Sequence, residues 1–191
     1  KVSSHCILKL EPPPMSKSAG VNSFLYLSLP RFHIPPSDWN PESFILEGAE
    51  AHHCASVMRR EPGDEVVLFN GQGDWAHARV TQANNRRVEL VALAQRRTPP
   101  PAVSLSLLQA IPKGGNMDLI IEKAVELGVN AIHPVTTQRT VVKLDVAAAA
   151  KKQVKGQQLA VEGCKQCGQN WLPQVTTPMG SETAGENLHT Q

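Results

Sequence analysis

The basic residues of this sequence are the first candidates for chemistry, because Arg and Lys side chains bind the phosphate groups of nucleic acids. The first half of the chain offers Arg31, Arg59 and Arg60, and the second half offers Lys113, Arg139 and Lys143. Each of them could instead be an ordinary solvated surface charge. The residue types by themselves leave both interpretations open, phosphate binding and a plain charged surface.

The overall charge of the chain does not decide between these interpretations. Nineteen Lys and Arg residues against seventeen Asp and Glu residues leave a net charge of only +2. A nucleic-acid site would therefore have to come from a local cluster and not from a global field. Hydrophobic residues make up 41% of the 191 residues, which is ordinary for a globular protein.

The apolar stretches and the cysteines of the sequence indicate a compartment. The longest apolar stretch near the start, residues 24–30, is too short to cross a membrane. Four cysteines are too few for a secreted disulfide scaffold of this length, and no signal peptide precedes them. We therefore expect a cytoplasmic protein with no membrane partner.

Three short patterns suggest a metal, nucleotide or redox site, and the sequence supports none of them. His52 and His53 are adjacent, and neighbouring helical residues point about 100° apart, so the pair cannot easily share a metal ion. His53 could instead hydrogen-bond a base or brace a domain interface. Gly114-Gly115 lacks the rest of a phosphate-binding pattern and is predicted to be a flexible turn. Cys164-x-x-Cys167 is predicted to be structural, because it lies near a helix end, where the dipole opposes thiolate formation.

The elements that would position the first group of basic residues are short strands separated by tight turns. Alternation places Ala76, Ala78 and Val80 on one face of a half-exposed strand. A helix is predicted over residues 50–60, with Arg59 and Arg60 in its last turn. Strands are predicted over residues 31–34, 43–46, 65–69, 75–81 and 88–92. This pattern is typical of a small β-barrel.

A run of prolines, residues 99–101, separates this region from one with a different pattern. Met117, Ile120, Ile121 and Ala124 share one face of a predicted helix that Gly128 is suited to end. The predicted order is a strand over 103–108, a helix over 116–127, a strand over 129–135, a helix from the N-cap Asp145 towards Gly168, and a strand over 172–176. Alternating strands and helices predict a parallel α/β sheet. Lys113 then lies at the carboxyl end of a strand, where such sheets bind ligands.

Several runs of residues, in order, carry a resemblance to a known family. Residues 111–118 read IPKGGNMD, residues 121–129 read IEKAVELGV, residues 132–135 read IHPV and residues 137–140 read TQRT. Residues 162–168 read EGCKQCG and are followed by WLP at 171–173. These runs resemble the lysine turn, the "QKatELGV" helix, the "i-x-P" strand, the "teR-s" loop and the "EaxeQcgR-x-x-vP" segment of the RsmE family of bacterial 16S rRNA uridine N3-methyltransferases.

The first half of the chain resembles the same family. Residues 30–34, PRFHI, are similar to its opening, and His53 with residues 57–59, VMR, fits its "H-x-x-x-V-L-R" helix. PGD at residues 62–64 and FNG at residues 69–71 follow in the family's order. The resemblance covers residues 30–179 and favours Arg59 as an RNA contact, because Arg59 stands at the arginine of the helix motif.

The resemblance implies two domains and a methyl transfer reaction. It implies a PUA-like RNA-binding β-barrel over residues 29–97, a proline-rich linker over 98–101, and part of an α/β SPOUT-type domain over 102–191, with residues 1–28 as a tail. Family members are homodimers that use S-adenosylmethionine to methylate a uridine of 16S rRNA in the small ribosomal subunit. The resemblance adds His53 to the basic candidates as an RNA-binding residue.

The sequence also departs from the family pattern. It has no counterpart of the glycine-rich "GPEGG" turn or of the "LG-x-R-I-L-R-x-E-T-A" segment that surround the methyl donor, and Gln169 stands where the family has Arg. We therefore expect an incomplete trefoil-knot domain, with the donor-binding and catalytic residues outside this sequence, and we expect this sequence alone not to be an active methyltransferase. The alternative to an enzyme fragment is a non-catalytic rRNA-binding module. A small-molecule α/β enzyme is disfavoured, because no nucleotide fingerprint or catalytic triad motif is present.

Overall fold

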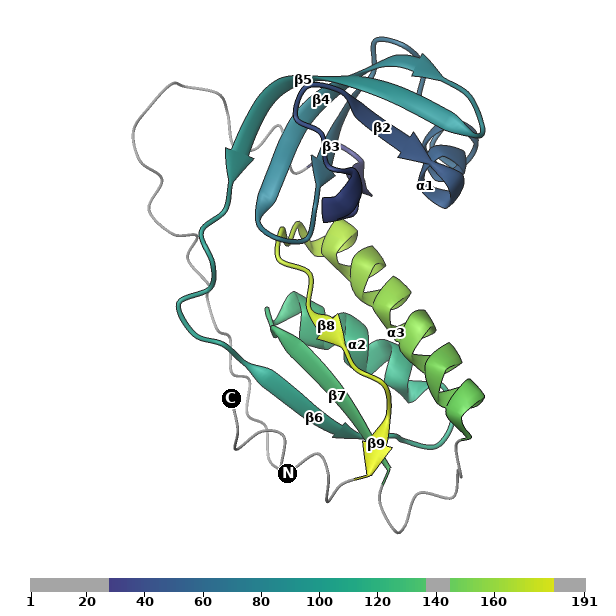
Figure 1. Cartoon of the computed structure of the whole chain (residues 1–191), viewed down its shortest axis with the longest axis vertical. Helices are drawn as coiled ribbons and strands as arrows, with labels where there is room; N and C mark the ends of the chain where they lie inside the picture. The colour runs from purple at the N-terminus through teal and green to yellow at the C-terminus, as the bar shows by residue number, and fades with distance from the viewer. Residues whose placement is uncertain (1–27, 137–144, 181–191) are drawn as a thin grey trace, which may run out of the picture.

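A computed structural model of the chain describes residues 28–136 and 145–180. Arg139, Lys143 and all of the predicted tail except Ser28 lie outside the described residues. Figure 1 shows two layered units, a curved β-sheet with short helical segments and, below it, a second sheet covered by longer helices. The extended segment that follows residue 97 connects them.

The first unit is a five-stranded sheet in the order β1-β3-β4-β5-β2. Its strands are β1 Arg31–His33, β2 Phe44–Glu47, β3 Glu65–Phe69, β4 Asp74–Ala83 and β5 Arg87–Arg97. Strand β1 runs parallel to β3, and the other neighbours are antiparallel. Two register shifts between β4 and β5, next to Ala78 and Val80, accompany the curvature of the sheet. A short 3-10 helix, η1 Pro36–Asp38, lies between β1 and β2.

The alternation in β4 builds the core of this unit, as the sequence predicts. Ala76, Ala78 and Val80 are buried. They pack with Phe32 and Phe44 in one apolar cluster. Small side chains on β4 leave room for the large rings of β1 and β2, so the sheet can curl over its own core.

The predicted helix over residues 50–60 is displaced. It begins earlier, as α1 Gly48–His52, continues as a π-helical turn, η2 His53–Val57, and ends at Val57. Beyond it the chain reverses through Arg59, whose φ is +51°, and the amide of Arg60 donates to the carbonyl of Cys54 at 3.0 Å. The prediction that Arg59 and Arg60 lie in the last helical turn is therefore wrong, because this backbone reversal ends the helix before them.

The second unit is a parallel sheet, which confirms the predicted α/β class. Its elements are β6 Ser106–Ala110, α2 Asn116–Glu126, β7 Ala131–Thr136, α3 Val146–Cys167, β8 Gln174–Val175 and β9 Met179–Gly180. Strand β7 pairs in parallel with β6 on one edge and with β8 and β9 on the other. Buried Ile121, Val125, Ala160 and Cys164 of the helices pack on Ile132 of the sheet.

The ends of α3 are also as predicted. The Asp145 carboxylate accepts a hydrogen bond from the Ala148 amide at 2.6 Å, and Gly168 ends the helix with a φ of +82°. Close packing on α2 requires a small residue at Gly163, where an added Cβ would lie 3.2 Å from Val125. No helix in residues 28–136 and 145–180 is long and apolar enough to cross a membrane.

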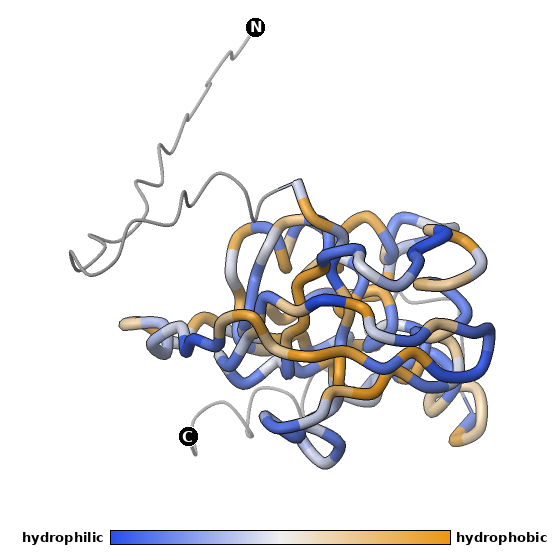
Figure 2. The backbone as a smooth tube through the Cα atoms, turned by 90° about the horizontal axis from the view of Figure 1, so that it is seen from above, coloured by the Kyte–Doolittle hydropathy of each residue, from blue (hydrophilic) through white to orange (hydrophobic). Residues whose placement is uncertain are grey.

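Strand β6 begins three residues later than predicted. The preceding Val103 and Leu105 are 75% and 52% exposed, and the Leu105 carbonyl and amide bond to Asn130, in the turn between α2 and β7. Hydrophobic composition alone therefore overestimated the strand, because these apolar residues precede the segment that pairs with β7. Figure 2 shows long hydrophobic stretches crossing the middle of the molecule.

Candidate nucleic-acid interface

The two units meet where the segment after α3 packs against the loop between β3 and β4. Gln72 forms an isolated antiparallel bridge with Trp171, and the Trp171 indole Nε1 donates to the carbonyl of Pro99 at 3.0 Å. Gly73 lies so close that an added Cβ would be 2.7 Å from both Thr98 O and the Trp171 ring. Since Gly73 also has a φ of +95°, only glycine fits this position without strain.

Arg31 is part of this junction. One guanidinium nitrogen donates to Asn170 Oδ1 at 2.6 Å and to the Gln169 carbonyl at 3.3 Å, and the guanidinium carbon lies 5.0 Å from the centre of the Phe69 ring. Burial lowers the pKa of the Arg31 guanidinium. These partners, which hold Arg31 between the two units, could not be predicted from the sequence.

An ion pair and a shared core complete the junction. Lys165 of α3, whose side chain is only 7% exposed, pairs with Glu50 of α1 and with Glu162. Glu50 also accepts from the backbone amide of His33 at 3.2 Å. Phe69, the last residue of β3, is fully buried within the apolar cluster of the second unit. The two units therefore hold one another in a fixed orientation through polar and apolar contacts.

Arg59 is the most accessible basic candidate of the first unit. It is exposed, next to Val57 and Met58, which are 59% and 37% exposed. Arg60 is half-buried and lies 3.8 Å from the Asp64 carboxylate. A phosphate would meet Arg59 without displacing an ion pair, whereas Arg60 already faces an anion.

His53 lies in the first unit, half-buried. Its ring stands edge-on to Phe32, with 5.7 Å between ring centres and 72° between planes. This geometry is a favourable aromatic contact with the core of the first unit. The ring therefore packs against the core of the first unit.

Lys113 lies in the turn between β6 and α2, at the carboxyl edge of the parallel sheet, as the sequence predicts. It is exposed and lines a cavity of about 370 Å³ together with Lys152 and Lys155 of α3. Apolar residues, among them Ile121 and Val175, line the rest of this cavity. We call it the lysine cavity; sequence reasoning missed the contribution of α3.

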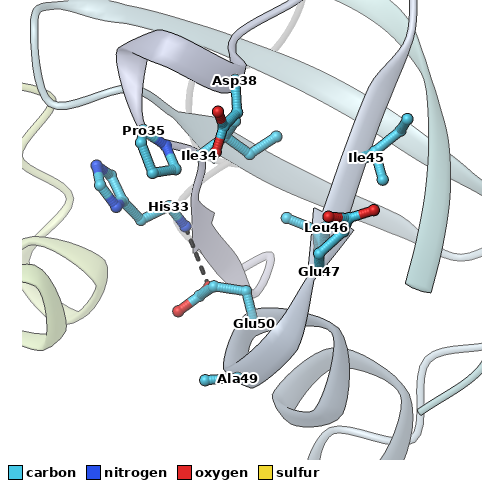
Figure 3. Close-up of a pocket in the computed structure, with 9 residues that line it drawn as sticks. All are labelled: His33, Ile34, Pro35, Asp38, Ile45, Leu46, Glu47, Ala49 and Glu50. Atoms are coloured by element: carbon cyan, nitrogen blue, oxygen red, sulfur yellow. Dashed lines mark hydrogen bonds between the residues drawn. The ribbon is translucent and has the colours of Figure 1, made fainter. Parts of the chain in front are cut away.

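A second cavity, of about 430 Å³, lies in the first unit between β1 and β2 and has the opposite character (Figure 3). Asp38, Glu47 and Glu50 line it, and the His33 ring points away from the other side chains drawn. Burial lowers the pKa of His33 and so favours the neutral ring. Three carboxylates repel phosphate, so this cavity does not extend the basic surface.

The cysteines have the character of structural residues. Burial raises the pKa of Cys164 to about 12 and that of Cys54 to about 11, and it also raises the pKa of Cys167. Thiols that stay protonated are poor nucleophiles and poor metal ligands. Within the part of the chain that the structure describes, no group of three or more His, Cys, Asp or Glu side chains could hold a metal ion.

Comparison with known proteins places both units in one family. A family model described as an RNA methyltransferase PUA domain matches residues 46–93, and one described as an RNA methyltransferase domain matches residues 99–191. Ribosomal RNA small subunit methyltransferase E from Bacillus subtilis is 30% identical over 136 residues. The chain belongs to the ribosomal RNA small subunit methyltransferase E family.

Solved structures agree with this methyltransferase E assignment. Methyltransferase E from Neisseria gonorrhoeae bound to S-adenosyl methionine is 33% identical, with a TM-score of 0.74 over 82% of this chain and 64% of that chain. A methyltransferase from Legionella pneumophila in complex with the same cofactor is 28% identical, with a TM-score of 0.72 over 78% of this chain and 62% of that chain. The predicted family and the predicted architecture, a PUA-like domain followed by an α/β methyltransferase domain, are confirmed.

The matches cover only part of each relative. The alignment with the Bacillus subtilis protein covers 70% of this chain but 52% of that protein, and the one with the Synechocystis protein covers 91% and 54%. The chain thus spans about half the length of the curated relatives it matches.

Proposed function

We propose that this chain acts in the S-adenosylmethionine-dependent N3-methylation of a uridine in 16S rRNA of the small ribosomal subunit, in the cytoplasm. The observation that carries the proposal is the match of both domains, in order, to an RNA methyltransferase PUA domain and an RNA methyltransferase domain. Support comes from the junction at Arg31 and Trp171, because an RNA bound by one domain is then presented to the other in a fixed orientation.

The chemistry requires removal of the N3 proton, positioning of the base and a donor in line with the nitrogen. The described residues serve the positioning step through phosphate contacts. Arg59 on the PUA-like domain and Lys113 on the α/β domain are the leading RNA contacts, because both are exposed and neither has an acidic partner among the described ion pairs. The remaining candidates are Arg31, His53, Arg60, Arg139 and Lys143.

The lysine cavity does not suit S-adenosylmethionine, whose sulfonium is a cation. Lys113, Lys152 and Lys155 surround it, and Asp118 is the one carboxylate that lines it. Repulsion between a sulfonium and an excess of ammonium groups opposes donor binding there. We therefore propose that the donor-binding and catalytic groups lie outside residues 28–136 and 145–180.

A homodimer is also proposed, from the family resemblance, and light scattering in solution tests it.

Two measurements test the function. The first is the affinity of the chain for 16S rRNA, and the second is the formation of N3-methyluridine, followed by nucleoside mass spectrometry, in cells that lack their own methyltransferase E and express this chain. RNA binding with N3-methyluridine formation supports the proposal. RNA binding without the modified nucleoside, both in this chain and in a version extended by the downstream reading frame, supports the alternative, a non-catalytic rRNA-binding module. Loss of both would overturn the proposal.

A further inference from the structure

The lysine cavity has two chemically different parts. Its inner wall is apolar and buried: Ile121 and Val175 are 3% and 1% exposed, and Pro134 of β7 is buried beside them. Its rim carries the ammonium groups of Lys113, from the turn after β6, and of Lys152 and Lys155, from α3. The cavity thus offers an apolar wall under a cationic rim.

The cavity is lined by more ammonium groups than carboxylates. Lys155 pairs with Asp118 at 2.6 Å, which neutralises one ammonium group. Neither Lys113 nor Lys152 forms an ion pair with another residue in the described part of the chain. Two ammonium groups from separate elements therefore line the same cavity without an ion-pair partner among the described residues, and an anionic ligand would reduce their mutual repulsion.

The size of the cavity and its apolar wall limit which kind of anion can be its ligand. About 370 Å³ lies in the range of small-molecule sites and is large for a bare phosphate. Beside the buried Ile121, Pro134 and Val175, the half-buried Ile111 and Met117 line the cavity and offer a flat aromatic ring an apolar contact. A nucleotide combines both groups, because its base offers a flat aromatic face and its ribose carries the phosphate. We propose that the lysine cavity binds one unstacked nucleotide of the RNA, with its base on the apolar wall and its phosphate at Lys113 and Lys152.

This inference deepens the proposed function and rests on it, since the nucleotide belongs to the RNA on which the family acts. An enzyme that acts on a base inside folded RNA must take that nucleotide out of its stack. A cavity at the carboxyl edge of the sheet gives an unstacked nucleotide a place on the methyltransferase domain. The phosphate contact at Lys152 would make α3 part of the RNA-binding surface, in addition to the surface on the PUA-like domain.

The first test uses uridine 5′-monophosphate as the probe, titrated into the full chain by calorimetry, with uridine and inorganic phosphate as partial ligands. Binding of the nucleotide tighter than either part is expected. The double variant Lys113→Gln/Lys152→Gln should weaken it about tenfold, the size expected for loss of charge-assisted contacts. Lys151→Gln is the matched control, because Lys151 is exposed on α3 but does not line the cavity. Adjacent residues of a helix point about 100° apart, so the side chain of Lys151 points away from that of Lys152.

Two outcomes of this titration decide against the cavity. One is equal weakening by Lys151→Gln and by the double variant, which would mean a diffuse charge effect. The other is the same affinity for inorganic phosphate as for the nucleotide, which would mean that the apolar wall takes no part. Urea unfolding of each variant checks that these exposed substitutions leave the fold intact.

The second test separates RNA from a free nucleotide as the source of the ligand. A single-stranded decauridylate is titrated by fluorescence anisotropy at several salt concentrations and is also used to displace the bound monophosphate. Displacement is expected, and each lysine removed should lower the magnitude of the salt slope by about 0.7. If the monophosphate binds but the oligonucleotide does not displace it, the cavity serves a free nucleotide and the RNA assignment is wrong.

Failure of this inference differs from failure of the proposed function. If 16S rRNA binds and Arg59 variants weaken it, while Lys113→Gln/Lys152→Gln changes nothing, the cavity proposal is overturned and the proposed function stands. If no RNA binds to the unmodified chain, the proposed function is overturned, and the cavity proposal with it.

Discussion

At the scale of single residues, Arg59 combines a strained backbone with an exposed charge. It is the one non-glycine residue with positive φ in the described part of the chain. A left-handed conformation costs an L-residue about 1 kcal/mol, and such strain gathers at functional sites. A glycine would adopt this backbone conformation with less strain. The arginine is therefore explained by a function of its side chain and not by the conformation of the turn.

Arg59→Gly is expected to separate these two roles. Relief of the strained φ should leave the free energy of unfolding unchanged or raise it by about 1 kcal/mol, while the affinity for 16S rRNA falls. Urea unfolding and fluorescence anisotropy measure the two effects. Arg59→Ala, which also removes the charge but keeps the strain, should lose the same affinity without the gain in stability. Wild-type affinity in both variants would exclude Arg59 as an RNA contact.

The buried thiols predict a dependence of stability on pH. Burial raises the pKa of Cys54 to about 11 and of Cys164 to about 12, from an unfolded value of 9.0. Because the folded pKa is the higher, their stabilising effect is fully present below pH 9 and is lost as pH rises from there through the folded pKa. The free energy of unfolding should therefore fall between pH 9 and pH 11.

Denaturant titrations at several pH values check this prediction. Cys54→Ala and Cys164→Ala are each expected to flatten the fall above pH 9, whereas Cys167→Ala, at an exposed residue, should change it less. In the native protein at pH 8, Cys54 and Cys164 should resist a thiol reagent that labels Cys167. A steep fall that persists in both alanine variants would assign the effect to other groups.

At the scale of elements, the start of α3 depends on one side chain. The Asp145 carboxylate accepts from the Ala148 amide at 2.6 Å, in the geometry of a helix N-cap. Asp145→Ala should lower the free energy of unfolding by about 1 kcal/mol, whereas Asp145→Asn, which keeps an acceptor, should cost less. Urea unfolding measures both. Equal stability of the alanine variant and the wild type would mean that packing of α3 alone fixes its first turn.

The sequence predicted the parts of the fold that depend on residues close together along the chain. Strand β3 and the start of α2 lie at the predicted residues, and Asp145 and Gly168 bound α3, because turns, caps and apolar spacing act within a few residues. The π-helical turn η2 and strand β9 were missed. A π turn has no sequence pattern of its own, and the two-residue strand β9 depends on β7 beside it.

The candidate site was predicted in part for the same reason. Lys113 could be placed because it follows a strand of a parallel sheet. Lys152 and Lys155 are three apart on α3, a spacing that puts them on one helical face. Which face meets the cavity depends on how α3 packs against Ile121 and Val175, residues far away in sequence. That packing is a property of the tertiary structure.

At the scale of the whole molecule, the contact between the two domains decides how an RNA would span them. Arg59 and the lysine cavity lie on different domains, so their separation is fixed only if the junction is rigid. The junction joins Arg31 to Asn170, Glu50 to Lys165 and Gln72 to Trp171. An interface with both apolar and charged contacts couples domains more strongly than a flexible linker does.

Trp171→Ala is therefore expected to uncouple the domains. It removes the indole hydrogen bonds to the carbonyls of Thr98 and Pro99 and the ring contact with Gly73, and it should cost on the order of 2 kcal/mol, because the ring is only partly buried. Thermal unfolding should split into two transitions, and the radius of gyration from X-ray scattering should rise. Trp39→Ala is the control, since Trp39 packs against the core of the PUA-like domain and should lower stability without uncoupling. If Trp171→Ala keeps one transition and an unchanged radius, the remaining contacts of Arg31 and Lys165 are sufficient, and the rigid junction does not depend on the tryptophan.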